Sequence, residues 1–285
     1  MSGDAAFSST LPPVTTRHRT IAFTSGKGGV GKSNLVLNTG LAMARRGRRV
    51  TILDGDLGLA SINVLLGLSP RYDLRHVVAG ERALHEIVLQ GPHGLAIIPA
   101  GSGIAELANL REDGREALLA QFGALAERAD YFLIDTGAGI SDTVLNLVAA
   151  SDEAIVVTRP EPTALADAYA LIKIIVQQEP AYPFHLLINM VRDARQAEQV
   201  YRALEQILVR FLGYRPGNAG FVVTDARVAD GVVQQVPFTL LAPHCAAARG
   251  VDALAERMLG ARRPGEDGAS TEGFCARIGR WRWRT

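Results

Sequence analysis

The sequence predicts a single α/β domain whose mostly parallel central sheet is flanked by helices on both faces. Short apolar runs recur along the chain and alternate with longer segments in which apolar residues repeat at helical spacing. The runs are apolar nearly throughout rather than at every second residue, which is typical of parallel strands buried on both faces. The length of 285 residues, with 48% hydrophobic and 21% charged residues, suits one large globular domain.

The elements are predicted in the following order. The first 19 residues are polar and are expected to form a flexible arm before a domain at residues 20–260. Strands are predicted at residues 20–24, 50–53, 95–99, 131–134, 154–158, 184–190 and 220–223. Helices are predicted between most of them, at residues 33–46, 115–128, 163–178 and 194–212. Residues 261–273 have the glycine, proline and charge of a linker, and residues 274–285 form a basic, aromatic tail.

The composition excludes several classes of protein. The net charge of +1 gives no general reason to expect nucleic-acid binding. No apolar stretch approaches the roughly 18 residues of a membrane span, and the first residues lack the apolar core of a secretory signal. The two cysteines, Cys245 and Cys275, are too few for a disulfide framework or a zinc site. We therefore expect a cytoplasmic protein with reduced thiols.

Lysine is concentrated in one glycine-rich segment. Two of the three lysines lie in Gly-Lys-Gly-Gly-Val-Gly-Lys-Ser at residues 26–33, whereas the other 27 of the 30 basic residues are arginine. Lysine is a compact point charge on a thin stem, and arginine is a broad planar fork. A loop that closes around a phosphate has room for lysine, so the segment predicts a nucleotide site.

The segment has the pattern and the context of a P-loop. Gly26, Gly31, Lys32 and Ser33 meet the pattern G-x-x-x-x-G-K-[ST], between a predicted strand and a predicted helix. Lys32 is expected to reach the β- and γ-phosphates, and the Ser33 hydroxyl to ligate Mg²⁺. The alternative, a chance match in a glycine-rich turn, is disfavoured by the flanking elements. The predicted nucleotide-binding residues of the loop are Gly26, Lys27, Gly28, Gly29, Val30, Gly31, Lys32 and Ser33.

Three aspartates are candidates to serve this loop. Asp54 and Asp56 follow the second strand, at the carboxyl end where α/β proteins place ligands. Asp135 ends the apolar run at residues 131–134, as in a Walker B strand whose carboxylate faces Mg²⁺. A cap or turn role is the alternative, and it fits Asp54 better than Asp56. The predicted metal site comprises Ser33, Asp54, Asp56 and Asp135.

Lys27, at the second position of the loop, is surplus to the phosphate cradle. With it, the sequence resembles the deviant Walker A ATPases of the ParA/MinD superfamily, whose loop reads K-G-G-x-G-K-[ST]. The resemblance implies a P-loop domain with slow, Mg²⁺-dependent ATP hydrolysis that is activated by homodimer formation. It implies that Lys27 crosses the dimer interface to the partner's nucleotide, as an arginine finger does elsewhere. Lys27, Lys32 and Asp56 are then the catalytic residues, with Asp56 orienting the attacking water.

The same resemblance implies the adenine contacts. Asn189, at the end of the strand at residues 184–190, matches an asparagine that reads the base. A turn role is the alternative reading of this side chain. Thr224 and Asp225 follow the last strand, where the family often has a proline, and they complete the predicted nucleotide contacts.

Longer stretches resemble one branch of the superfamily, the FlhG/FleN regulators of flagellar number. The segment at residues 52–68 is similar to their D-x-D-L-G-L-A-N-x-D-x-L-L-G-L motif, and the segment at residues 161–173 agrees as well. The resemblance covers about residues 20–259. It implies partners in flagellar assembly, namely an FlhF-type GTPase, a switch-complex component or a flagellar transcription activator. Residues 1–19 lack the D-Q-A-x-x-L-R segment that stimulates such a GTPase.

The C-terminal tail is a second departure from the family pattern, after the missing segment in residues 1–19. Phe274, Ile278 and Trp281 fall on one helical face among arginines, which suits an anionic membrane surface at the inner face of the cell membrane. A disordered tail is the alternative, and arginine–tryptophan contacts with nucleic acid are a third reading. Lys173, the remaining lysine, is interpreted as a surface charge or as a residue that faces a partner.

Three functions remain open. The first is an ATP-dependent dimerisation switch that regulates flagellar number or placement and associates reversibly with the membrane. The second is a ParA-type partition ATPase that binds DNA, which the near-zero net charge disfavours. The third is a nucleotide-controlled antagonist of a flagellar transcription activator. An iron–sulfur reductase is disfavoured, because neither cysteine lies near the predicted loop carboxylates.

Overall fold

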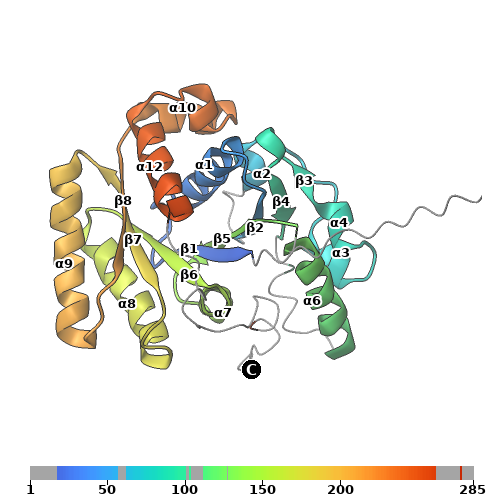
Figure 1. Cartoon of the computed structure of the whole chain (residues 1–285), viewed down its shortest axis with the longest axis horizontal. Helices are drawn as coiled ribbons and strands as arrows, with labels where there is room; N and C mark the ends of the chain where they lie inside the picture. The colour runs from blue at the N-terminus through green and yellow to red at the C-terminus, as the bar shows by residue number, and fades with distance from the viewer. Residues whose placement is uncertain are drawn as a thin grey trace, which may run out of the picture.

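The computed structural model describes residues 18–56, 62–100, 103, 112–126, 128–260 and 277. Its centre is an eight-stranded sheet in the order β3-β4-β2-β5-β1-β6-β7-β8 (Figure 1). The predicted fold class is confirmed, since every pairing in the sheet is parallel except that of β3 with β4. The strands are β1 (Arg19–Ser25), β2 (Val50–Gly55), β3 (Leu89–Gln90), β4 (Ala96–Pro99), β5 (Tyr131–Ala138), β6 (Glu153–Thr158), β7 (Phe184–Val191) and β8 (Gly217–Val223).

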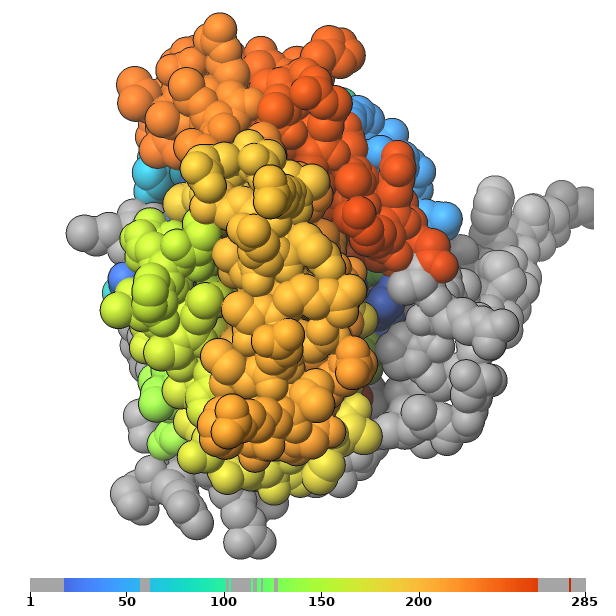
Figure 2. All heavy atoms as spheres, turned by 90° about the vertical axis from the view of Figure 1, so that its left-hand side faces the viewer, coloured from blue at the N-terminus to red at the C-terminus, as the bar shows by residue number. Residues whose placement is uncertain are grey.

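Helices cover both faces of the sheet (Figure 1). One face carries α1 (Lys32–Arg45), α11 (Phe238–Leu241) and α12 (Ala246–Gly260), and the other carries α6 (Glu112–Ala126), α7 (Asp142–Ala150), α8 (Pro162–Gln178) and α9 (Ala194–Leu212). Figure 2 shows α9 spanning one end of the molecule, below α10 (Ala226–Gln234). The short helices α2 (Ile62–Leu65), α3 (Leu74–Val78) and α4 (Leu84–Ile87) and the 3₁₀ turn Pro92–Gly94 lie between β2 and β4 in sequence.

The central strands are buried on both faces, as their uniform apolar character predicts. Ile21 and Phe23 of β1 point into the cluster beneath α1 and α12, whereas Ala22 points into the cluster beneath α7 and α8. All three side chains are fully buried. Burial of this apolar surface is the main force that holds the layers together.

The first strand begins one residue earlier than predicted. Arg19 is its first residue and is 6% exposed, with its guanidinium paired to the buried carboxylate of Glu153. One Nη donates to the carbonyl oxygen of Met258 at 2.7 Å. A buried arginine with these partners ties β1 to β6 and α12, which explains why a charged residue can start a central strand.

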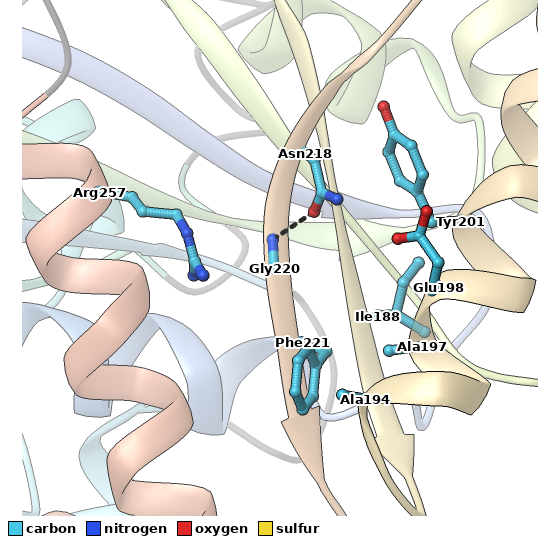
Figure 3. Close-up of a pocket in the computed structure, with 9 residues that line it drawn as sticks. All are labelled: Ile188, Ala194, Ala197, Glu198, Tyr201, Asn218, Gly220, Phe221 and Arg257. Atoms are coloured by element: carbon cyan, nitrogen blue, oxygen red, sulfur yellow. Dashed lines mark hydrogen bonds between the residues drawn. The ribbon is translucent and has the colours of Figure 1, made fainter.

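The outer strand β8 has protected edge groups (Figure 3). The Asn218 side chain accepts a hydrogen bond from the Gly220 N–H at 2.8 Å, and Arg257 donates to the Ala219 carbonyl at 3.2 Å. A groove of about 560 Å³ lies beside this strand between α9 and α12. These edge groups are already bonded, which disfavours pairing with a strand of another chain.

The predicted arm up to residue 17, the linker at residues 261–273 and the tail at residues 274–285 lie outside the described residues, apart from Arg277. Among the described residues, no helix is long and apolar enough to cross a bilayer.

Candidate nucleotide-binding site

The predicted phosphate loop connects β1 to α1 at the carboxyl edge of the sheet. Gly31 precedes α1 with a φ of 88°, and no side chain caps the helix through a hydrogen bond. The first N–H groups of a helix carry partial positive charge and need acceptors from outside the helix. The start of this 14-residue helix is therefore arranged to accept an anion.

Two glycines of the loop are required by close packing. A Cβ atom at Gly26 would lie 2.2 Å from the backbone oxygen of Asp167 in α8. A Cβ atom at Gly31 would lie 2.5 Å from the Asn189 amide nitrogen, and its φ of 88° already favours glycine. Neither position can accept a side chain without a shift of the surrounding structure.

Lys32 lies among carboxylates from two neighbouring strands. Its Nζ is 2.6 Å from Asp135 Oδ1 and 3.4 Å from Asp56 Oδ2. Lys32 is 5% exposed and Asp135 is fully buried, whereas the Asp56 side chain is 22% exposed. Burial raises the pKa of Asp135, and hydrogen bonds from Lys32 and Ser33 oppose that rise. The structure thus brings together four of the predicted residues, Lys32, Ser33, Asp56 and Asp135.

Asp54 is a second buried carboxyl group of the site whose pKa is raised. It is 2% exposed, and its Oδ2 accepts a hydrogen bond from the Ile62 N–H at 2.8 Å. Burial, together with the nearby charges of Asp135 and Asp56, raises the pKa of Asp54 to about 7. The hydrogen bond to Ile62 agrees with the turn role considered for this residue. The raised pKa reflects mainly the burial of Asp54 and, after that, the neighbouring Asp135 carboxylate.

The donor set fits a magnesium ion that is shared with phosphate. Asp54 Oδ1 and Asp135 Oδ2 are buried and have no hydrogen-bond partner among the described residues. No three side chains of the metal-ligating types converge within the described part of the chain. Mg²⁺ usually binds one or two carboxylates and completes its shell with water and substrate phosphates, so these oxygens suit it.

The Lys27 side chain contacts residues at the start of α8. Its Nζ is 3.3 Å from Glu161 Oε2 and donates to the Thr163 hydroxyl at 3.1 Å. Glu161 is shared with Arg159, whose Nη2 lies 2.6 Å from Oε1. The side chains of Lys27 and Glu161 are 36% and 41% exposed. Lys32 and Lys27 therefore lie in different environments, one buried among carboxylates and one partly exposed. Their separate roles stay a prediction.

The predicted adenine contacts have other partners in this structure. Asn189 donates from Nδ2 to the Val30 carbonyl at 2.8 Å, which braces the phosphate loop. The Thr224 N–H donates to the Val191 carbonyl at 2.8 Å. Asp225 caps α10, and hydrogen bonds from the N–H groups of Arg227 and Ala247 help to lower its pKa. A base contact of these three residues stays a prediction.

Sequence reasoning missed the residues that hold Lys27. Glu161 and Thr163 lie 134 and 136 positions away, at the start of α8. In the sequence, Glu161 belongs to the segment at residues 161–173, which is used only for its family resemblance. Nothing in that segment indicates that Glu161 contacts Lys27. Lys173 is exposed on α8, as expected of a surface charge.

Comparison with known proteins identifies the family. The model described as ParA, NUBPL iron-transfer P-loop NTPase, matches residues 16–193, which is more than half of the chain. The chain belongs to the ParA/MinD family of P-loop NTPases. Solved relatives with the same fold are called ATPases, among them the cell division ATPase MinD of Pyrococcus furiosus.

Two curated relatives are an antiactivator and a flagellum site-determining protein. The antiactivator FleN of Pseudomonas aeruginosa is 35% identical over 258 residues, which cover 90% of this chain and 92% of FleN. The flagellum site-determining protein YlxH of Helicobacter pylori is 38% identical over 190 residues, which cover 66% of this chain and 63% of YlxH. The resemblance to the FlhG/FleN branch is confirmed.

Solved structures support the fold. MinD in the MinC:MinD complex of Aquifex aeolicus has a TM-score of 0.69 at 24% identity, covering 86% of this chain and 97% of that one. MinD of Pyrococcus horikoshii, which was solved with Mg-ADP, has a TM-score of 0.68 at 22% identity, covering 85% and 96%.

Proposed function

We propose that this protein is a Mg²⁺-dependent ATPase that acts as a dimerisation switch in the control of flagellar number or placement. Its 38% identity to the flagellum site-determining protein YlxH supports the flagellar role. The observation that carries the switch is the contrast between Lys32, which is buried against Asp135, and Lys27, which is half-exposed on Glu161.

The residues of one chain have separate roles in this proposal. The loop N–H groups and Lys32 bind the nucleotide phosphates, and Ser33, Asp54 and Asp135 hold Mg²⁺, which neutralises phosphate charge when bound. Asp56 orients a water for attack on the γ-phosphate. Lys27 leaves Glu161 and contacts the nucleotide of a second copy, so that hydrolysis weakens the dimer.

Exposed apolar side chains near the carboxyl edge of the sheet support the proposal that a second copy of this chain covers this face. In the described part of the chain, four of the seven exposed large apolar residues lie in segments that follow β2, β5 and β8. They are Val64, Ile140, Val232 and Val233, with exposed fractions from 43% to 83%. Two of these segments touch, because Gln235 Nε2 donates to the Val64 carbonyl at 3.2 Å.

The output of the switch is proposed from the relatives. FleN is called an antiactivator, which favours a transcription activator as one partner of this chain. An FlhF-type GTPase and a switch-complex component are the other proposed partners. We also propose reversible binding of the basic tail to an anionic membrane. Nothing in the described site favours the alternative, DNA partition.

Three variants and a matched control test the switch. Lys32→Ala should abolish ATP binding, Lys27→Ala should retain ATP binding but lose ATP-dependent dimers, and Asp56→Ala should bind ATP and remain dimeric without hydrolysis. Lys173→Ala removes a lysine from exposed α8 surface and should behave as wild type. Nucleotide binding by fluorescence, dimerisation by analytical ultracentrifugation and phosphate release report the three steps. ATP-dependent dimers of normal stability in Lys27→Ala would refute the switch.

A further inference from the structure

A second concave surface lies at the opposite edge of the sheet from the phosphate loop. A cavity of about 510 Å³ is lined by Val50 and Thr51 at the amino end of β2, four residues before Asp54. A smaller cavity of about 260 Å³ adjoins it and shares three lining residues, among them His85 and Arg128. In Figure 1, α4, α6 and β4 lie at the end of the molecule opposite α9.

The lining is strongly biased toward basic side chains. Five ionisable residues line the larger cavity, namely Arg48, Arg49, Arg128, His85 and His93. Among the residues that the structure describes, no aspartate or glutamate lines either cavity. Because the whole chain has 30 basic and 29 acidic residues, this composition is a local feature rather than a reflection of net charge.

Separate segments of the fold bring these side chains together. Arg48 and Arg49 lie between α1 and β2, His85 lies on α4, and Arg128 follows α6. His93 occupies the turn between β3 and β4, with a φ of 56°, and the next residue, Gly94, has a φ of 75°. Consecutive positive φ values are the requirement of a tight type I′ hairpin turn, which fixes His93 at its tip.

The positive charge of this lining exceeds what the surrounding structure neutralises. Arg49 pairs with Asp130 at 2.7 Å. Burial acts to raise the pKa of the Asp130 carboxyl, but Arg49 and Arg48 together lower it below its usual value. No described carboxylate forms an ion pair with Arg48 or Arg128. The carboxyl ends of α1 and α6 contribute about half a negative charge each. Counted over the described residues, the lining carries three guanidinium charges, which face the Asp130 carboxylate and the two helix ends. About one positive charge is then left over, before either histidine is counted.

We propose that this cavity binds a small phosphate-bearing anion, at a site separate from the nucleotide loop. Cavities of about 300–1,000 Å³ accommodate small ligands, and this one falls within that range. Guanidinium groups bind phosphate oxygens through two parallel hydrogen bonds, and three arginines line this cavity. The ligand class is a phosphate ester or pyrophosphate of the size of a metabolite.

Calorimetric titration with inorganic pyrophosphate tests the site. The chain is first saturated with Mg-ADP in a fixed excess of Mg²⁺, so that the phosphate loop is occupied in every sample. We compare the wild type with Arg48→Gln/Arg128→Gln and with the control Arg195→Gln/Arg210→Gln. The control removes the same charge from exposed positions of α9, at the other end of the sheet. The first variant should bind pyrophosphate about tenfold more weakly, and the control should bind as wild type.

Several results would overturn the proposal. Equal affinity of the two double variants would show that pyrophosphate responds only to overall charge. A lower melting temperature of Arg48→Gln/Arg128→Gln with unchanged binding would mean that these arginines serve only the helix ends. Arginine-dependent co-sedimentation with phosphatidylglycerol vesicles, without pyrophosphate binding in solution, would assign the surface to a membrane instead.

The affinity for Mg-ADP serves as the folding control. An unchanged Mg-ADP affinity in both double variants shows that the nucleotide site is still folded.

Discussion

Asp54 offers a quantitative test of the charge arrangement at the nucleotide site. Its carboxyl group is buried beside Asp135 and Asp56, with Lys32 as the nearby cation and the Ile62 N–H as its hydrogen-bond donor. The variant Asp54→Asn keeps an oxygen for Ile62 and removes the negative charge. We expect it to stabilise the nucleotide-free protein at alkaline pH and to weaken its response to Mg-ADP.

The magnitude follows from the pKa. The value rises from 3.8 to about 7, and at about 1.4 kcal/mol per unit the ionised carboxylate costs about 4 kcal/mol of folding free energy. Below the unfolded pKa both states are protonated and nothing is lost. As the pH rises from 3.8 to about 7, the unfolded chain releases this proton first, so stability falls and then stays low. An unpaired amide N–H₂ in the variant offsets about 1–3 kcal/mol of the gain.

Urea denaturation in EDTA, followed by circular dichroism, measures the effect without metal. Between about pH 5 and pH 8 the wild type should lose about 3 kcal/mol relative to Asp54→Asn, since about two of the three pKa units fall in that interval. Asp130→Asn serves as a control, because Arg49 holds the pKa of Asp130 below 3.8. The stabilisation from this carboxylate is complete above its unfolded pKa, so this variant should be less stable than the wild type by a constant amount between about pH 5 and pH 8. Parallel pH profiles for the wild type and Asp54→Asn would refute a raised pKa at Asp54.

Two further perturbations address the loop itself. Gly26→Ala should unfold the start of the loop and lower the melting temperature by several degrees, because its Cβ would meet the Asp167 backbone, whereas Gly28→Ala, with 4.0 Å to the nearest atom, should melt like the wild type without nucleotide. Equal melting temperatures for these two variants would contradict the packing argument. Glu161→Gln should release Lys27 and lower the protein concentration needed for half-dimerisation in ATP by at most a few-fold, since an exposed ion pair contributes little. Weaker dimers of Glu161→Gln in sedimentation experiments would place Glu161 in the dimer contact instead.

The residues of the nucleotide-binding motifs are the part of the site that the sequence predicts best. The spacing of Lys32 and Asp135 predicted their meeting, because a strand–loop–helix unit and a neighbouring parallel strand place both at one edge of the sheet. The two-residue strand β3 and the helices α2 to α4 were missed, since elements this short have no periodicity to detect. The longer helices α7, α10 and α12 were also not named among the predicted helices.

The partners of Lys27 and Asn189 could not be predicted for a different reason. Glu161 and Val30 lie 134 and 159 residues away from them, and such contacts depend on the order of strands in the sheet. The cap formed by Asp225 had a local signal, an aspartate before an amphipathic segment, which was assigned to the nucleotide instead.

The contact between Gly26 and Asp167 links two parts of the molecule mechanically. No side chain separates the backbone of the loop from that of α8 at this point, so the two have little room to slide past each other. A displacement of the loop at Gly26 would therefore be passed to a 17-residue helix. The exposed surface of α8 around Lys173 would then move together with the phosphate loop.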